Sequence, residues 1–99
     1  MKPKQHLSLL HSLDCAATWL IEGKRVKCEI VHHPQFIRDE LSDWIGIPLL
    51  KKYHSRDSPT GLHYLSRRGF ERTFKVSELD LLAVTIMFIQ ERNKCLSQA

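Results

Sequence analysis

The chain has 99 residues, enough for one domain with one modest hydrophobic core. Hydrophobic residues make up 42% and charged residues 26%, typical of a globular protein, and no apolar run approaches the roughly 20 residues that span a bilayer. The net charge of +4 favours a polyanionic partner, because each phosphate contact releases counterions. The basic N-terminus lacks a signal-peptide apolar segment, so we expect a cytoplasmic protein with no membrane partner.

The first predicted elements lie before Pro34. Residues 4–21 carry apolar side chains at helical spacing, which predicts a helix. The part around 19–21 is also compatible with a strand that enters a hairpin at 22–25. The run 26–31 predicts a strand, which Pro34 ends.

The central elements follow after a polar stretch. Residues 35–43 predict a loop, and 44–47 predict a second short strand that Pro48 stops. Residues 49–54 then start a helix. The cluster at 57–61 contains Asp, Ser, Pro and Gly, which is a strong turn signal.

The last predicted element is an apolar helix. Ser77 lies three residues before Asp80, an imperfect form of the capping box that starts helices. The pattern from Leu79 onward predicts a helix that ends near Lys94. Because this helix is apolar on more than one face, we expect it to be buried on more than one side. That expectation leaves room for a homodimer or a protein partner at the C-terminal helix.

The order strand, loop, strand, helix in the centre predicts an α+β fold. We interpret residues 1–99 as a single domain with a ββα arrangement at its core. A helix or hairpin flanks this core on the N-terminal side, and the apolar helix flanks it on the C-terminal side.

Histidines concentrate in the same central part. His32 and His33 lie at the end of the first predicted strand, and His54 lies on the helix after the second. Neighbouring strand residues point to opposite faces, but a bend at Pro34 would let one ring bind a metal while the other faces a substrate. Spacing alone leaves a structural role for this pair equally open. We interpret His6 as an ordinary surface or core residue, like the histidine at position 11.

That division of labour suits phosphodiester hydrolysis. The reaction needs a group that removes a proton from water, and imidazole is the side chain whose ordinary pKa lies nearest neutral pH. It also needs a cation that stabilises charge on the phosphate and on the leaving oxygen.

Several motifs occur in one order and at compatible spacing across about residues 12–89. They are CEIVHH at 28–33, DWIGIPL at 43–49 with His54, GLH at 61–63, FERTF at 70–74 and ELDLLA at 78–83. Together they resemble the phage recombination-enhancement-function (Ref-like) group of HNH nucleases. The resemblance implies a ββα-metal core and a metal-dependent DNA endonuclease that acts in phage or prophage recombination.

The resemblance also implies roles for four histidines. His32 and His54 would be metal ligands, and His33 would be the general base. His63 would complete the metal shell or contact phosphate. The implied cofactor is one divalent ion, Mg²⁺, Mn²⁺ or Zn²⁺, and the implied partner is DNA.

Basic residues near these histidines would hold the DNA backbone on both sides of the scissile phosphate. They are Lys51, Lys52, Arg67, Arg68 and Arg72. The aromatic residues Trp44 and Tyr53 lie inside apolar elements, so we interpret them as core residues rather than base-stacking platforms.

The chain departs from the family pattern where the family carries cysteines. Leu50 and Thr18 stand at two of these positions, which leaves Cys15 and Cys28. Structural zinc normally takes four ligands, so we predict no cysteine-based structural zinc. The odd number of cysteines also argues against a disulfide scaffold.

Two alternatives stay open, and the lost cysteine positions motivate the first of them. The first is a catalytically degenerate DNA-binding module that retains the fold. The second is a small phage-encoded interaction or inhibitor protein that docks through its C-terminal helix.

Overall fold

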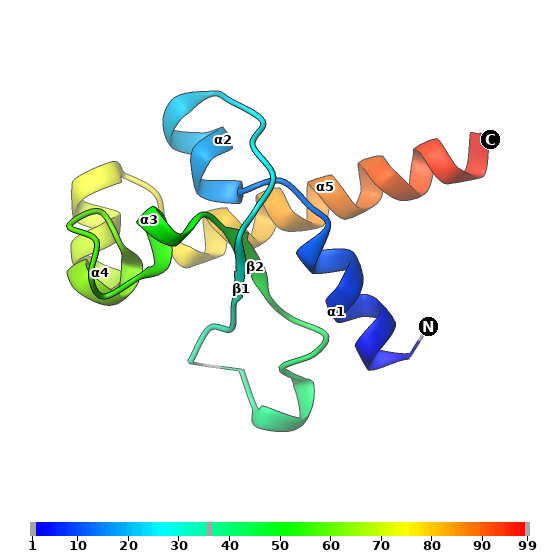
Figure 1. Cartoon of the computed structure of the whole chain (residues 1–99), viewed down its shortest axis with the longest axis horizontal. Helices are drawn as coiled ribbons and strands as arrows, with labels where there is room; N and C mark the ends of the chain where they lie inside the picture. The colour runs from blue at the N-terminus through cyan, green and yellow to red at the C-terminus, as the bar shows by residue number, and fades with distance from the viewer. Residues whose placement is uncertain (1, 36, 99) are drawn as a thin grey trace.

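The computed structural model of the chain describes residues 2–35 and 37–98, apart from the side chains of residues 39 and 95–98. It is a small α+β fold in which helices surround a two-stranded sheet (Figure 1). In chain order the elements are α1 (Pro3–His11), α2 (Ala16–Glu22), β1 (Ile30–His32), the 3₁₀ turn η1 (Asp39–Leu41), β2 (Ile47–Leu49), α3 (Lys51–His54), α4 (Leu62–Phe74) and α5 (Glu78–Gln98). Among the described residues, no helix is both long and apolar enough to cross a bilayer.

The sheet pairs β1 and β2 in antiparallel orientation, with Val31 opposite Pro48 and His32 opposite Ile47. The second strand therefore starts at Ile47 and contains Pro48, so the prediction that this proline ends a strand at 44–47 is wrong. Each strand of a two-stranded sheet has an outer edge, and proline is tolerated where its nitrogen faces away from the partner. The first strand is also shorter and later than the predicted 26–31.

The N-terminal region forms two helices instead of one helix or a hairpin. Cys15 separates them, because its Sγ accepts a hydrogen bond from the Thr18 amide at 3.3 Å and thereby caps α2. Gly23 ends α2 in a left-handed conformation with φ of 70°, which glycine adopts without steric cost. The alternative strand at 19–21 is therefore wrong, since these residues lie within α2.

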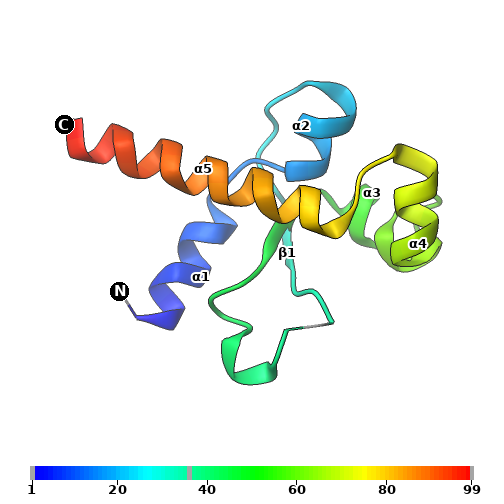
Figure 2. The same ribbon diagram turned by 180° about the vertical axis from the view of Figure 1, so that it is seen from behind.

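The start of α5 confirms the predicted capping box. The Ser77 amide donates to Asp80 Oδ2 at 2.9 Å, and the Asp80 amide donates to Ser77 Oγ at 3.0 Å. The helix continues past the predicted end near Lys94 and runs across the sheet and α2 (Figure 2).

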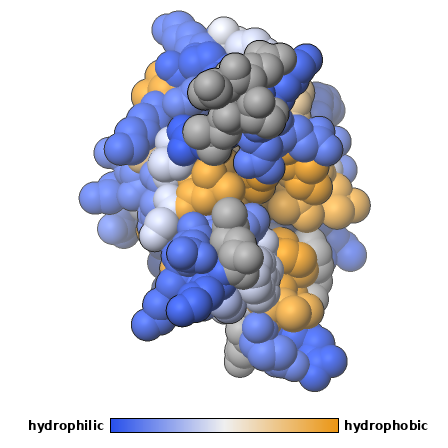
Figure 3. Space-filling model, turned by 90° about the vertical axis from the view of Figure 1, so that its right-hand side faces the viewer, coloured by the Kyte–Doolittle hydropathy of each residue, from blue (hydrophilic) through white to orange (hydrophobic). Residues whose placement is uncertain are grey.

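One face of α5 packs into the core through Leu81, Val84 and Phe88. The prediction that α5 is buried on more than one side is wrong for the single chain, because Leu79 is 66% exposed and Ile86 is 48% exposed. Apolar side chains lie at the surface of the end of the molecule where α1 and α5 meet (Figure 3). A partner for this helix stays a prediction.

The core contains residues from every helix and both strands. Tyr53 is buried in it, as predicted, and its ring contacts those of Phe70 and Phe74. The prediction that Trp44 is a core residue is wrong, because this side chain is 37% exposed and lies against the His6 ring at the start of the chain. The core therefore fixes α3 through Tyr53, which directly precedes His54.

Candidate metal centre

Three histidines from three elements meet beside the sheet. His32 ends β1, His54 ends α3, and His63 is the second residue of α4. The Nε2 atoms of His54 and His63 lie 3.1 Å apart, and one ring nitrogen from each of the three residues lies within 4.8 Å of the others. The structure thus brings together the three residues predicted as metal ligands.

A closed turn places two of these rings side by side. The hydroxyls of Ser58 and Thr60 both donate to the Lys52 carbonyl, at 2.7 and 2.6 Å. The turn ends at Gly61, where a Cβ would lie 1.9 Å from the Ser55 carbonyl oxygen, so only glycine fits. The turn predicted at 57–61 thus folds α4 back onto α3.

The electrostatics of the cluster suit a metal ion. Burial, with a smaller contribution from neighbouring histidines, lowers the pKa of His32 to about 4, and burial also lowers that of His54 to about 4. Both rings are therefore neutral near pH 7 and offer the lone pairs that metal binding requires. The 3.1 Å between the Nε2 atoms of His54 and His63 is close to the roughly 3.3 Å that separates two nitrogens bound at about 2.0 Å to one tetrahedral ion. The residues thus fit a divalent ion.

His33 follows His32 directly but takes a different position. Its ring is exposed, and its Nδ1 lies 3.3 Å from the carbonyl oxygen of Ile45. The next residue, Gly46, packs against Val31, since a Cβ there would lie 2.5 Å from Val31 Cγ1. The structure therefore places His32 in the cluster and leaves His33 outside it, with Nε2 away from the backbone contact.

Glu78, the first residue of α5, belongs to the same site although the sequence did not single it out. Its Oε2 lies 3.2 Å from His32 Nε2, and both side chains are buried, with 7% and 3% exposed. Burial raises the pKa of Glu78, while Arg67 at 3.8 Å acts in the opposite direction. The capping box predicts where α5 starts, but only long-range packing brings that start against β1.

A cavity of about 450 Å³ opens beside the cluster. Its lining includes His32 and His63 together with three arginines, Arg56, Arg67 and Arg68. Arg67 and Arg68 were predicted to contact a nucleic-acid backbone, whereas Arg56 was missed because it lies in the turn rather than in a patterned helix.

A break in α4 lies where Ser66, Arg67 and Arg68 line the cavity. Ser66 has φ of 67° and ψ of 167°, which is not helical, and its hydroxyl accepts a hydrogen bond from the Gly69 amide at 3.3 Å. A second helical segment therefore begins after Ser66, and Arg67 and Arg68 lie in its first turn.

The other three predicted basic residues lie away from the cavity lining. Lys52 Nζ pairs with Glu22 Oε2 at 2.8 Å. Lys51 is exposed at the start of α3, and Arg72 is exposed in the last turn of α4. Their predicted contact with DNA would need a surface wider than the cavity.

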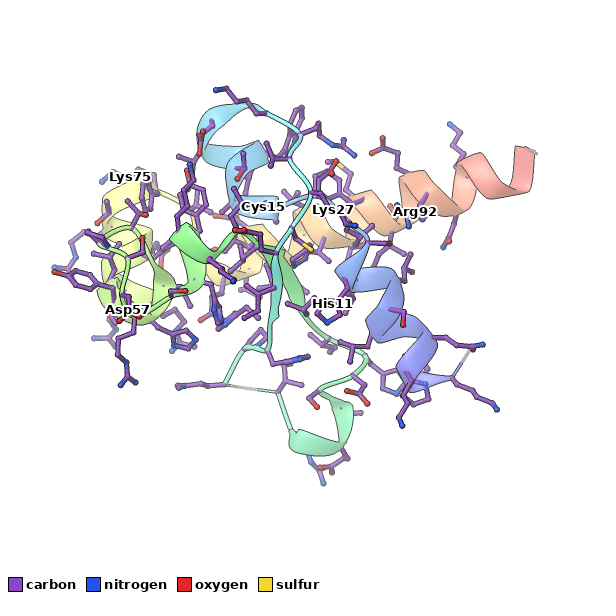
Figure 4. All side chains as sticks on the ribbon, in the orientation of Figure 1. His11, Cys15, Lys27, Asp57, Lys75 and Arg92 are labelled. Atoms are coloured by element: carbon purple, nitrogen blue, oxygen red, sulfur yellow. The ribbon has the colours of Figure 1, made fainter. Side chains whose placement is uncertain are left out.

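The two described thiols are buried and hydrogen-bonded to the backbone. Cys15 Sγ accepts hydrogen bonds from the amides of Thr18 and Leu50, the latter at 3.1 Å, while Cys28 Sγ donates to the His11 carbonyl at 3.3 Å. Both side chains are buried, and Cys15 lies at the centre of the fold (Figure 4). The side chain of Cys95 lies outside the described residues. The absence of cysteine-bound zinc stays a prediction.

Comparison with protein-family models, with curated proteins and with solved structures finds no match to this chain. The resemblance to Ref-like HNH nucleases therefore stays a prediction.

Proposed function

We propose that this protein is a metal-dependent nuclease that hydrolyses phosphodiester bonds in DNA, with one divalent ion held by His32, His54 and His63. The observation that carries the proposal is the convergence of these three rings on one point beside an arginine-lined cavity. Two paired strands followed directly by α3 support a ββα arrangement around that point.

The donor set argues for the kind of ion. Three imidazole nitrogens suit Zn²⁺, Mn²⁺ or another transition metal better than Mg²⁺, which prefers oxygen ligands in an octahedral shell. Three protein ligands with a further position open is the arrangement of catalytic rather than structural zinc sites. When bound, such an ion supplies Lewis-acid stabilisation of the charge that develops on the phosphate and the leaving oxygen.

His33 would supply the proton transfer. A carbonyl oxygen only accepts hydrogen bonds, so the contact with Ile45 places the ring proton of neutral His33 on Nδ1. Nε2 then carries the lone pair and can remove a proton from water. This step contributes roughly 10²–10⁴ in rate in other enzymes.

The arginines of the cavity would bind the substrate. Arg56, Arg67 and Arg68 line the same space as His32 and His63, so a phosphate in the cavity contacts both cationic side chains and the metal ligands. Guanidinium groups match phosphate oxygens in charge and in geometry. These contacts with phosphates would position the DNA backbone in the site without distinguishing the base sequence.

The test is cleavage of supercoiled plasmid and of single-stranded DNA with Mn²⁺, Zn²⁺ or Mg²⁺ added to metal-free protein. We expect cleavage with a transition metal and a loss of about 10²–10⁴ in rate in His33→Ala. His11→Ala is the matched control, because His11 is an exposed histidine on α1.

Two results would contradict the proposal. The first is failure to cut either DNA form with any of the three ions. The second is full activity in His33→Ala. DNA binding without cleavage in the wild type would favour the degenerate binding module instead.

A further inference from the structure

Glu78 is a buried acid held against a buried base. Only 7% of its side chain is exposed, and its Oε2 lies 3.2 Å from Nε2 of His32, of which 3% is exposed. Its second oxygen lies 3.8 Å from Nε of Arg67. Buried ionisable groups cost free energy unless they are paired, so this arrangement needs an explanation.

The backbone fixes the carboxylate in this position. The reciprocal hydrogen bonds between Ser77 and Asp80 determine the first turn of α5, and Glu78 lies inside that turn. A carboxylate near a helix N-terminus is favoured by the helix dipole. Leu81 packs one turn later in the core, which holds the start of α5 against the sheet. Glu78 is therefore positioned by a capped and anchored helix end rather than by a loop.

The contact determines which nitrogen of His32 carries the proton. A neutral imidazole has one N–H, and an ionised carboxylate can only accept a hydrogen bond. The hydrogen bond to Glu78 therefore requires the proton on Nε2, which leaves the lone pair on Nδ1. His33, whose Nδ1 faces the Ile45 carbonyl, is held in the opposite tautomer. Two neighbouring histidines thus differ in the nitrogen that is free.

We propose that Glu78 is a positioning residue that holds His32 as its Nε2–H tautomer and leaves Nδ1 as the nitrogen with a lone pair for a metal shared with His54 and His63. This inference rests on the proposed metal centre. A carboxylate behind a ligating histidine fixes the ring's orientation and increases its basicity, and loss of such a partner typically lowers metal affinity about 10–100-fold.

The first test reads the tautomer directly in the full-length, metal-free chain. Long-range ¹H–¹⁵N NMR correlations of the histidine rings at pH 7.5 distinguish a protonated nitrogen from an unprotonated one. We expect wild-type His32 to be protonated at Nε2 and His33 at Nδ1. In Glu78→Leu, which removes the acceptor, the His32 signals should shift toward a mixture of both tautomers. A wild-type His32 protonated at Nδ1 would overturn the proposal without any variant.

The second test measures zinc affinity by competition with a chromophoric chelator. Glu78→Gln keeps the shape of the side chain and Glu78→Leu removes its polarity, and both should bind Zn²⁺ about 10–100-fold more weakly than wild type. The matched control is Glu71→Gln, the same change at an exposed glutamate of α4. Circular dichroism melting shows whether each variant folds, and Glu78→Gln serves if Glu78→Leu does not.

The outcomes separate the two proposals. If the wild type does not bind zinc at the three histidines, the proposed function fails, whereas the tautomer result still reports on Glu78. If the wild type binds zinc and Glu78→Gln and Glu78→Leu bind equally well, the positioning role is overturned and the metal centre stands. A loss in Glu78→Gln as complete as in His54→Ala, with wild-type His32 protonated at Nδ1, would make Glu78 a direct ligand and would also overturn it.

Discussion

The imidazole cluster and the thiol pair are two groups of metal-binding residue types in one small fold, and they differ in what their donor atoms already contact. His54 and His63 turn nitrogens toward each other at the edge of a cavity. Cys15 and Cys28 are buried, and their sulfurs are hydrogen-bonded to backbone amides and carbonyls. The comparison teaches that residue type alone does not mark a candidate site, because the ring nitrogens converge on one another beside a cavity whereas the sulfurs serve the backbone.

The sharpest test of this contrast is the removal of one donor from each group. His54→Ala and His63→Ala should each weaken zinc binding by more than the roughly 10–100-fold that loss of an outer partner costs. Cys28→Ser should leave zinc affinity unchanged, because its sulfur serves the His11 carbonyl and a hydroxyl can replace it. Isothermal titration of metal-free protein measures all three. Equal losses in the cysteine and histidine variants would erase the distinction between the groups.

The next largest effect is the pH dependence of stability. The pKa of His32 falls from 6.5 to about 4 in the fold, so the unfolded chain binds the proton more readily. The contribution of the neutral His32 ring to the free energy of unfolding is therefore complete above pH 6.5 and is lost as the pH falls toward 4. The loss is roughly 3 kcal/mol at most. Glu78, whose pKa is raised by burial, acts in the opposite sense.

Urea unfolding with a chelator present, at pH 7, 6 and 5, measures this loss. We expect the free energy of unfolding to decrease with each step and the decrease to be smaller in His32→Asn. A decrease in His32→Asn as large as in the wild type would show that the His32 ring is not kept neutral by burial.

The thiols should matter for stability alone. Cys15→Ala leaves the amides of Thr18 and Leu50 without their acceptor, which should cost about 1–3 kcal/mol. Cys15→Ser, which keeps an acceptor, should recover part of this loss. Zinc affinity and DNA cleavage should be unchanged in both variants. Chemical denaturation gives the first quantity, and a measurable change in zinc affinity would argue against the separation of the two groups.

The smallest effect concerns the arginines beside the cluster. Arg56→Gln and Arg68→Gln should each reduce the slope of log affinity for DNA against log salt by about one. Lys52→Gln should change this slope less, because Lys52 is paired with Glu22 away from the cavity. Fluorescence anisotropy in a salt series measures the slopes. A larger effect of Lys52 than of Arg56 would move the DNA-binding surface to the α2–α3 side.

Local sequence signals predicted the elements that local rules govern. The capping box at Ser77 and Asp80 marks the start of α5, and the turn signal at 57–61 separates α3 from α4. Strand limits were less predictable. Pro48 would stop a strand in a larger sheet but is accommodated in a two-stranded one.

The candidate site was predictable only in part, because local sequence signals do not show which distant segments pack together. The meeting of His32, His54 and His63 could be anticipated from motifs in one order, although spacing alone left it open. Glu78 and Arg56 carried no local signal. Their places depend on how α5 packs against β1 and how the turn after α3 folds, and both are set by contacts between segments far apart in the sequence.

The turn between Ser55 and Gly61 has a consequence for the origin of binding strength at this site. Because it already holds the rings of His54 and His63 together, binding of the proposed ion would require little further ordering of the chain. Occupancy would then mainly clamp this turn onto the end of β1 through His32. An ion would thus act as a cross-link between two parts of the molecule, slowing the local opening of α3 and α4 more than it alters their shape.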